Sequence, residues 1–170
     1  MRAGGWGYLL GDEGSGFWVG REAIRAVLAA KEGWGEQTRL TDMLSETLGT
    51  SDAGEWLSAL YRTQNPQSLL AELAPLVTEA AEQGDASAQN ILFHAAEHLA
   101  DLVLHLVEHL HLPEDFPVCT VGGVWKSPSV LQRFHRQLVE RLPYWRGGVQ
   151  PPMYSPVEGA LLIAQRLMWA

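Results

Sequence analysis

GGWGYLLGDEGSGFW, residues 4–18, is the stretch that decides how the rest of the chain is interpreted. It is rich in glycine and aromatic residues, and it places Asp12 and Glu13 side by side in a nearly bare backbone. It is not a phosphate loop, because the GxxxxGK(S/T) pattern is missing and two carboxylates would repel phosphate. A carboxylate among bare amides suits a neutral polyol, such as a sugar, or a metal ion. The alternative is a glycine-rich hairpin in which Asp12 caps a turn.

The composition limits the classes of function. The chain has 170 residues, 46% of them hydrophobic, which is enough for one ordinary domain or two small lobes. A net charge of −8 argues against nucleic acid as a partner. The apolar runs are too interrupted for a membrane span, and the first residues do not resemble a signal peptide. The single cysteine, Cys119, excludes an intrachain disulfide framework and favours a cytoplasmic location.

Helical patterns dominate the chain. Apolar spacing, capping residues and prolines predict helices over 16–31, 38–48, 53–63, 66–84, 86–111, 128–142 and 156–168. Residues 6–10 are expected to form a short strand or hairpin arm, and 116–125 a buried strand that ends in two glycines. No internal repeat or linker is visible.

The segment VGGVWKS, 121–127, follows the second predicted strand and precedes a predicted helix. Ligands of open α/β sheets bind at the carboxyl ends of strands, and glycine lets a flat ring approach the backbone closely. The alternative is a tight turn in which Ser127 is an ordinary helix N-cap. The spacing alone does not distinguish the two interpretations.

Histidines and arginines offer weaker candidates. His94 and His98 are four residues apart on a predicted helix, as are His105 and His109, and such pairs suit a metal ion. No third ligand is fixed by the sequence, so a solvated helix face is favoured and no metal site is predicted. The basic residues of the later part of the chain are interpreted in the same way, as a solvated helix face and its exit: Arg133, Arg136, Arg141 and Arg146.

Four segments resemble one family in the same order. GGWGYLLGDEGSGFWVGREAI, from residue 4, resembles the central signature of N-acetylglucosamine kinases, which belong to a larger ATPase family that includes activators of benzoyl-CoA reductase. VCTVGGVWKS, from residue 118, is similar to the family's second glycine motif, beside the adenosine. LYRTQNPQSLLAELAPLVTEAAEQGD, from residue 60, and SPVEGALLIAQR, from residue 155, fit between and after them.

The resemblance implies a fold and a set of site residues. The fold would be α/β, the C-terminal domain of the actin/hexokinase/Hsp70-like ATPase fold, helix-rich with a small sheet and spanning residues 1–170. The residues matched to the sugar segment are Gly5, Trp6, Gly7 and Asp12. The residues expected beside ATP are Ala71, Gly122, Gly123 and Ser127, and the match of Ala71 needs a gap.

The resemblance also implies what this sequence lacks. The family begins with a phosphate-binding hairpin, a catalytic aspartate and a second phosphate loop, and none of the three is matched here. The chain therefore resembles the C-terminal half of an ATP- and Mg²⁺-dependent kinase that phosphorylates the 6-hydroxyl of N-acetylglucosamine or glucosamine, with no catalytic residue of its own. Whether the complete protein forms a homodimer is left open by the sequence.

Two other functions are weighed against the kinase. One is an activator-type ATPase, which would need cysteines for an iron–sulfur cluster, and a lone Cys119 cannot build one within a chain. The other is a non-catalytic helical binding module.

Overall fold

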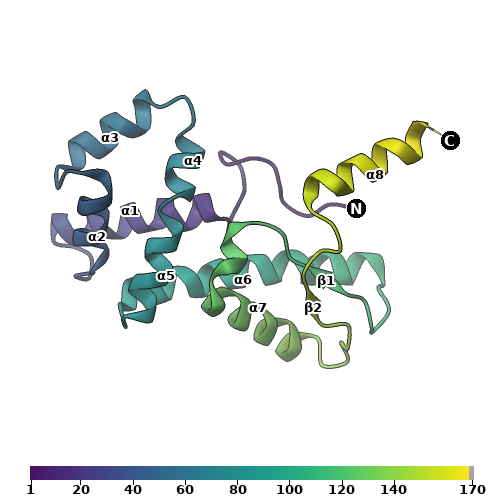
Figure 1. Ribbon diagram of the computed structural model, residues 1–170. Coiled ribbons are helices and arrows are strands. Elements are labelled where there is room, and N and C mark those ends of the chain that lie inside the picture. Colours follow the sequence, from purple (N-terminus) through teal and green to yellow (C-terminus); the bar gives the residue numbers. More distant parts are fainter. Residues whose placement is uncertain (169–170) are drawn as a thin grey trace.

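The computed structural model describes residues 1–168, and most of them lie in helices (Figure 1). The helices are α1 (Gly16–Glu32), α2 (Leu40–Leu48), α3 (Ala53–Arg62), α4 (Pro66–Ala71), α5 (Ala74–Glu82), α6 (Ala86–Leu110), α7 (Pro128–Arg141) and α8 (Pro156–Met168). A short 3₁₀ helix, η1 (Gly123–Lys126), precedes α7. The strands β1 (Val118–Cys119) and β2 (Val149–Gln150) pair in parallel. The expected helix-rich α/β class with a small sheet is confirmed.

Helices α1, α4 and α6 begin where their capping residues predict. Ser15 accepts a hydrogen bond from the backbone N–H of Trp18 and starts α1. Asn65 does the same for α4, and Asp85 for α6. Each side chain satisfies a donor that the first turn of a helix leaves unpaired. Each of these helix starts depends on residues only three positions apart, so the sequence alone predicts it well.

The fourth predicted helix is wrong in one respect, because it is two helices. The 66–84 pattern breaks after α4, and α5 begins at Ala74. Pro75 explains the break, since it has no backbone N–H and its ring would clash with the carbonyl of Ala71, four residues earlier. Ala71, the last residue of α4, and Ala74 and Pro75, the first residues of α5, line the pocket described below.

Both predicted strands are corrected by the structure. Residues 6–10 form a turn closed by a hydrogen bond from the N–H of Leu10 to the carbonyl of Gly7, and no strand. The predicted buried strand over 116–125 shrinks to the two residues of β1, which are half-buried and exposed. Its partner is β2, some thirty residues later in the chain. A pairing over this distance leaves no trace in the local pattern.

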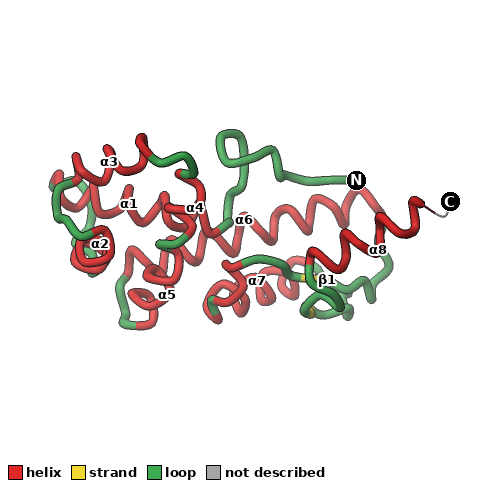
Figure 2. The backbone as a smooth tube through the Cα atoms, turned by 45° about the horizontal axis from the view of Figure 1, so that its top comes forward, coloured by secondary structure: helices red, strands yellow, loops and turns green. Residues whose placement is uncertain are grey.

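Helix α6 runs through the middle of the molecule and packs against α1, α5 and α7 (Figures 1 and 2). The predicted apolar face of α6 is buried in its first half, where Leu92, Ala95 and Ala96 join the core, and is progressively more exposed towards Leu110. Helix α7 contributes Phe134 and Leu138 to the same core. One hydrophobic core therefore joins the first helix of the chain to α7.

The basic side chains of α7 are only partly a solvated face. Arg136 is exposed, as predicted, and Arg141 donates to the Asp101 carboxylate of α6 at 2.6 Å. Arg133 contradicts the prediction, because it is half-buried with its guanidinium carbon 3.9 Å from the centre of the Phe93 ring. Stacking a guanidinium on an aromatic face holds α7 against α6.

A close contact of α1 with α4 depends on Gly20. A Cβ at this position would overlap the carbonyl oxygen of Leu70, and the atoms it meets belong to backbone. We expect Gly20→Ala to lower the free energy of unfolding by about 2 kcal/mol, because the clash costs about 3 kcal/mol and the better helix propensity of alanine returns about 1. The melting temperature should fall by about 4–8 °C.

A control separates the clash from helix propensity. Gly159, on α8, has open space around it, since a Cβ there would meet nothing within 4 Å, so Gly159→Ala gains propensity without a clash. Thermal unfolding should therefore show a loss for Gly20→Ala and none for Gly159→Ala. A melting temperature of Gly20→Ala at or above that of the wild type would contradict the close packing.

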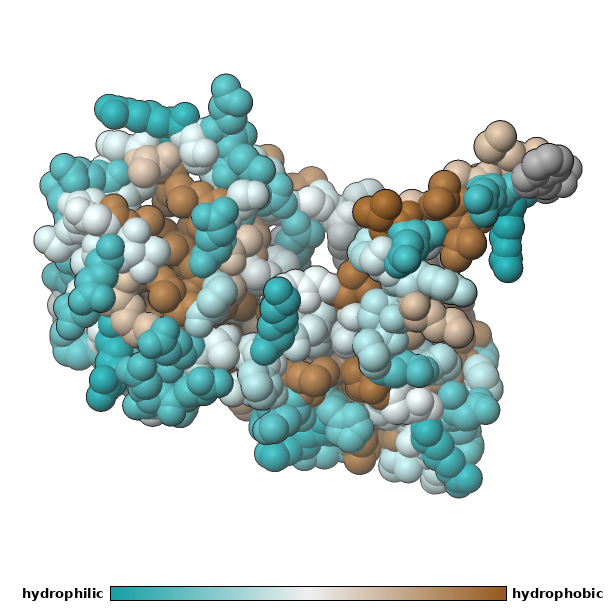
Figure 3. Space-filling view, viewed as in Figure 1, coloured by the Kyte–Doolittle hydropathy of each residue, from teal (hydrophilic) through white to brown (hydrophobic). Residues whose placement is uncertain are grey.

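Helix α8 leaves the body of the molecule and contributes no buried residue (Figure 1). Figure 3 shows hydrophobic side chains on it, and the exposed ones include Leu161 and Ile163. The predicted capping box is confirmed, since Glu158 and Ser155 exchange hydrogen bonds. The hydrogen bond with the Ser155 side chain is the larger cause that lowers the pKa of Glu158, and the hydrogen bond from the Ser155 backbone is the smaller one. Within residues 1–168, no helix is long and apolar enough to cross a membrane.

Candidate functional site

The glycine-rich N-terminal loop takes backbone conformations that favour glycine. Gly5 and Gly7 have φ values of 66° and 85°, and a Cβ at either would meet nothing within 4 Å. Trp6 between them is exposed, with the guanidinium of Arg2 over its ring at 4.2 Å. The three residues thus form an exposed, uncrowded loop with bare backbone on its open side, as contact with a ligand requires.

Asp12 also lies in the left-handed region, with a φ of 66°. Asparagine and aspartate are the side chains that tolerate this region best. Among residues 1–168, the one side-chain hydrogen bond of the carboxylate is accepted from the amide of Gln67 on α4, at 3.5 Å, while the backbone carbonyl of Asp12 accepts from the N–H of Ser15. The alternative interpretation, in which the Asp12 side chain caps a turn, is therefore wrong, and its oxygen atoms keep most of their capacity to accept hydrogen bonds.

The loop is fixed against α6 through Gly14. A Cβ at Gly14 would lie 2.6 Å from the carbonyl oxygen of Ala95 and 2.7 Å from Leu99, and the φ of Gly14 is 79°. Only glycine fits both constraints. The two ends of the candidate sugar segment therefore differ: residues 5–7 are open, and Gly14 is tightly packed where α1 begins.

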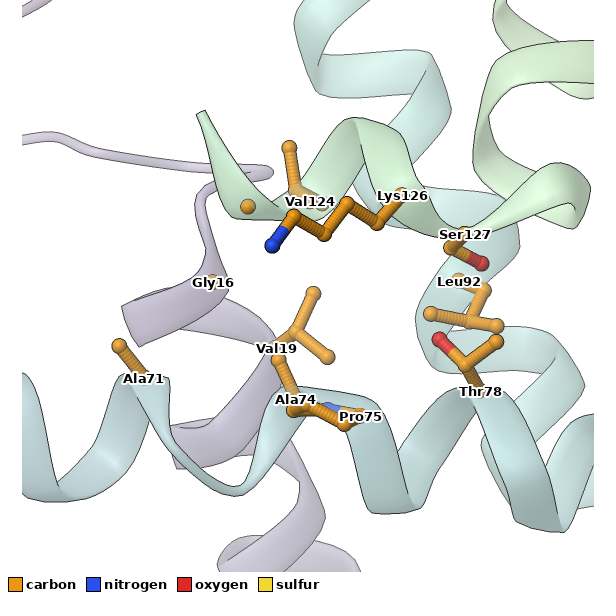
Figure 4. A pocket seen from close by; sticks show the side chains of 11 residues that line it. Gly16, Val19, Ala71, Ala74, Pro75, Thr78, Leu92, Val124, Lys126 and Ser127 are labelled. Carbon is orange, nitrogen blue, oxygen red and sulfur yellow. The ribbon is translucent and has the colours of Figure 1, made fainter. Parts of the chain in front are cut away.

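A pocket of about 420 Å³ lies between the start of α1, the α4–α5 break and η1 (Figure 4). Most of its wall is apolar, from Val19, Ala71, Ala74, Pro75, Leu92 and Val124. Bare backbone comes from Gly16 and Gly123, and polar groups come from Thr78, Lys126 and Ser127. A flat, largely apolar ring with polar groups at its edges would match this lining.

The pocket brings together three of the four residues that the resemblance places beside ATP. Ala71 is at the end of α4, whereas Gly123 and Ser127 are at the two ends of η1. Gly122 is next to the pocket in sequence and does not line it; its φ of 116° serves the turn before η1. The residues converge from distant parts of the chain because the Pro75 break and η1 face each other.

The hydroxyl of Ser127 is buried without a partner. Ser127 is at the N-cap position of α7, yet its side chain makes no capping hydrogen bond. Its Oγ has no hydrogen-bond partner among the described residues, and the residue is 5% exposed. The interpretation of Ser127 as an ordinary N-cap is therefore wrong. An unsatisfied buried hydroxyl costs about 1–3 kcal/mol, which a ligand in the pocket would recover.

The candidate sugar segment and the pocket adjoin each other. Gly16, four residues after Asp12, is the first residue of α1 and lines the pocket. Gln67, which donates to Asp12, lies on the helix that ends at Ala71. Helices α1 and α4 thus connect the two places, as two substrates of one reaction would require.

The histidines do not form a metal site. No group of three histidine, cysteine or acidic side chains could hold a metal ion within residues 1–168. His94 pairs with Glu97 at 3.2 Å, and the rings of His105 and His109 lie 4.2 Å apart on the exposed surface. His98 departs from the predicted solvated face, because it is half-buried with its ring edge-on to Trp18.

Sequence reasoning missed most of the pocket lining. Thr78 and Lys126 carry polar groups into the pocket, and neither was a candidate from spacing or motif. Lys126 stands beside Ser127 within the VGGVWKS segment, so its proximity was visible in the sequence. Thr78 had no such signal, because α5 and η1 are far apart in the sequence and meet only in the folded chain.

Comparisons with known proteins agree on one family. A model of the BadF/BadG/BcrA/BcrD ATPase family matches residues 1–164. An N-acetyl-D-glucosamine kinase of Dictyostelium discoideum is 36% identical over 96% of this chain and 52% of its own length. An N-acetylmuramic acid/N-acetylglucosamine kinase of Clostridium acetobutylicum is 34% identical over 96% of this chain and 54% of its own length.

Two solved structures share the fold. A protein of Chromobacterium violaceum, provisionally described as an N-acetylglucosamine kinase, superposes with a TM-score of 0.69 at 29% identity, covering 94% of this chain and 50% of that one. A similarly described protein of Porphyromonas gingivalis has a TM-score of 0.64 at 21% identity, covering 92% and 49%. The chain spans about half the length of the curated relatives and solved structures that it matches.

Proposed function

The chain belongs to the BadF/BadG/BcrA/BcrD ATPase family, and on that premise we propose that it forms the C-terminal, sugar- and adenosine-contacting domain of an ATP-dependent amino-sugar kinase. The substrate would be N-acetylglucosamine or glucosamine, phosphorylated at the 6-hydroxyl. The relatives at 34–36% identity are named as kinases of N-acetylglucosamine, one of them also of N-acetylmuramic acid. Their names support the substrate class.

The observation that carries the proposal is the pocket. Ala71, Gly123 and Ser127 converge on it, and the Ser127 hydroxyl is buried there without a partner. The apolar lining would take the base of ATP, and the adjoining loop with Asp12 would take the sugar. ATP bound there supplies the phosphoryl group. Among residues 1–168, no acidic side chain lines the pocket, so Mg²⁺ is expected to arrive on the phosphates of ATP rather than on residues of this pocket.

The chain's own residues would bind and orient the two substrates. Phosphoryl transfer depends on positioning of the nucleophile and on stabilisation of charge. The Asp12 carboxylate can accept from a sugar hydroxyl, and the bare backbone of Gly5 and Gly7 allows the ring to approach. Neither the matched residues nor the pocket contributes a phosphate cradle or a base that deprotonates the 6-hydroxyl.

The first test measures binding and turnover separately. The 170-residue chain should bind ADP, observed by calorimetric titration, and should release no ADP in an N-acetylglucosamine-dependent assay, because it lacks a phosphate cradle and a base. Protein kinases turn over at about 1–100 s⁻¹, and a rate in that range from this chain alone would contradict the proposed division of labour. A chain that binds no adenine nucleotide would favour the non-catalytic binding module instead.

The activator-type ATPase is the less favoured candidate. Cys119 is a free, exposed cysteine at the end of β1, and one thiol supplies only a quarter of the ligands that a four-cysteine cluster needs. The single cysteine therefore disfavours an activator-type ATPase.

A further inference from the structure

Two hydroxyl groups lie at the same end of the pocket. Thr78, on α5, and Ser127, at the start of α7, both line it. In Figure 4 the two residues lie at the same end of the pocket, with Leu92 between them in this view. They are not hydrogen-bonded to each other, since the Ser127 Oγ has no partner among the described residues. Thr78 is half-buried, and its hydroxyl is not among the buried polar atoms that lack a partner within residues 1–168. Two hydroxyls, of which that of Ser127 is buried and unpaired, therefore line the same end of the pocket.

The opposite end of the pocket has a positive charge. The Lys126 side chain extends along the pocket away from the hydroxyls, and its amine points towards the side where α1 begins at Gly16 (Figure 4). Val19 and Ala74 line the wall across the pocket from Lys126. Hydroxyls at one end and a cation at the other give the pocket a direction.

A purine nucleotide has the same order of groups. Its base carries hydrogen-bonding atoms on one edge and two apolar faces, and its phosphates are anionic at the far end. Adenine presents the 6-amino donor beside a ring-nitrogen acceptor. A hydroxyl can donate or accept, so two hydroxyls can satisfy both atoms at once. Leaving the Ser127 hydroxyl buried and unpaired would be costly in the absence of such a ligand.

We propose that Thr78 is a base-contacting residue, which together with Ser127 hydrogen-bonds the edge of adenine while Lys126 faces the phosphates. One of the two hydroxyls accepts from the 6-amino group, and the other donates to the neighbouring ring nitrogen. The proposal rests on the proposed function of this pocket as a nucleotide site. It adds a residue that no motif indicated, and it fixes which way round the nucleotide lies.

The test uses the full chain and titrates it with ADP. Thr78→Val keeps the shape of the side chain and removes the hydroxyl, so ADP affinity should fall about 2- to 10-fold, as expected for one neutral hydrogen bond. Ser127→Ala should lose affinity in the same range or more. Thr47→Val is the matched control, because Thr47 is an exposed threonine on α2 and lies outside the pocket; it should bind ADP like the wild type.

A nucleotide analogue identifies the atoms involved. Purine riboside diphosphate lacks the 6-amino group, so the penalty of one of the two variants should disappear with it while the penalty of the other persists. If both penalties persist unchanged on the analogue, the hydroxyls do not contact the base edge and the proposal is overturned. ADP binding by Thr78→Val at the wild-type level overturns it as well.

The outcomes also distinguish the proposed role of Thr78 from the proposed function of the pocket as a nucleotide site. A wild-type chain that binds no ADP removes the nucleotide site and the role of Thr78 together, whereas wild-type binding with an unaffected Thr78→Val removes only the role of Thr78. Melting curves check that each variant is folded. If Thr78→Val does not fold, Thr78→Ser and Thr78→Ala decide the question: the serine variant should keep ADP affinity, and the alanine variant should lose it.

Discussion

Asp12→Ala is expected to weaken sugar binding about 10- to 150-fold in the full-length protein. A sugar hydroxyl that donates to a charged carboxylate contributes about 1.5–3 kcal/mol, and each 1.4 kcal/mol corresponds to a factor of ten in affinity. Within the described part of the chain the Asp12 carboxylate accepts one long hydrogen bond, from Gln67 at 3.5 Å, so little competes with the sugar for its oxygens. ADP affinity should hardly change. Calorimetric titration with N-acetylglucosamine and with ADP measures both.

The backbone at Asp12 makes the choice of control important. Its φ of 66° is unfavourable for alanine, so part of any loss in Asp12→Ala could come from a displaced loop. Asp12→Gly removes the carboxylate without this strain and should lose the same affinity. Asp12→Asn tolerates the conformation, keeps one acceptor and should lose less. Glu13→Ala removes the neighbouring exposed acid and should bind sugar normally. Wild-type sugar affinity in Asp12→Gly would refute the role of the carboxylate.

Gly123→Val is expected to weaken ADP binding about 5- to 150-fold while the protein stays folded. Gly123 lines the pocket, and a Cβ there would meet nothing within 4 Å in the unliganded protein. Its φ is not in the left-handed region, unlike that of Gly122. The added side chain therefore occupies space meant for the ligand, at a cost of about 1–3 kcal/mol on binding.

A graded series makes the Gly123 result decisive. Gly123→Ala adds only the Cβ and should lose less affinity than Gly123→Val. Gly159→Val adds the same side chain to α8, again in open space, and should leave ADP binding unchanged. Circular dichroism and titration of the three variants are compared with the wild type. If Gly123→Val binds ADP as tightly as the wild type, η1 is a simple turn with no role in nucleotide binding.

Local features of the sequence predicted much of the fold. Ser15, Asn65 and Asp85 stand at helix starts because a side-chain oxygen satisfies a nearby backbone donor, and that requirement involves only a few neighbouring residues. The break at Pro75 is equally local, because proline has no backbone N–H for the helix. The prediction of one helix over 66–84 did not take this into account.

Long-range features could not be predicted in the same way. Strand β1 exists only because β2 pairs with it from a distant part of the chain, and the apolar run around β1 exaggerated its length and burial. The pocket has the same origin: Ala71 and Ser127 become neighbours through packing, which neither residue encodes locally. The resemblance named both residues, but it gave no reason to include Thr78.

The exposure of α8 determines how fast its amides exchange hydrogen. Helix α8 has 13 residues and buries none of them, and helices of about 12–15 residues are marginal in water without tertiary contacts. Helix and coil interconvert in about 0.1–1 µs in such segments, so the amides of α8 should exchange quickly while those in the buried half of α6 exchange only through larger openings. Any protein surface that covers α8 would slow the hydrogen exchange of its amides, so slow exchange in α8 would indicate that this helix is covered in an assembly.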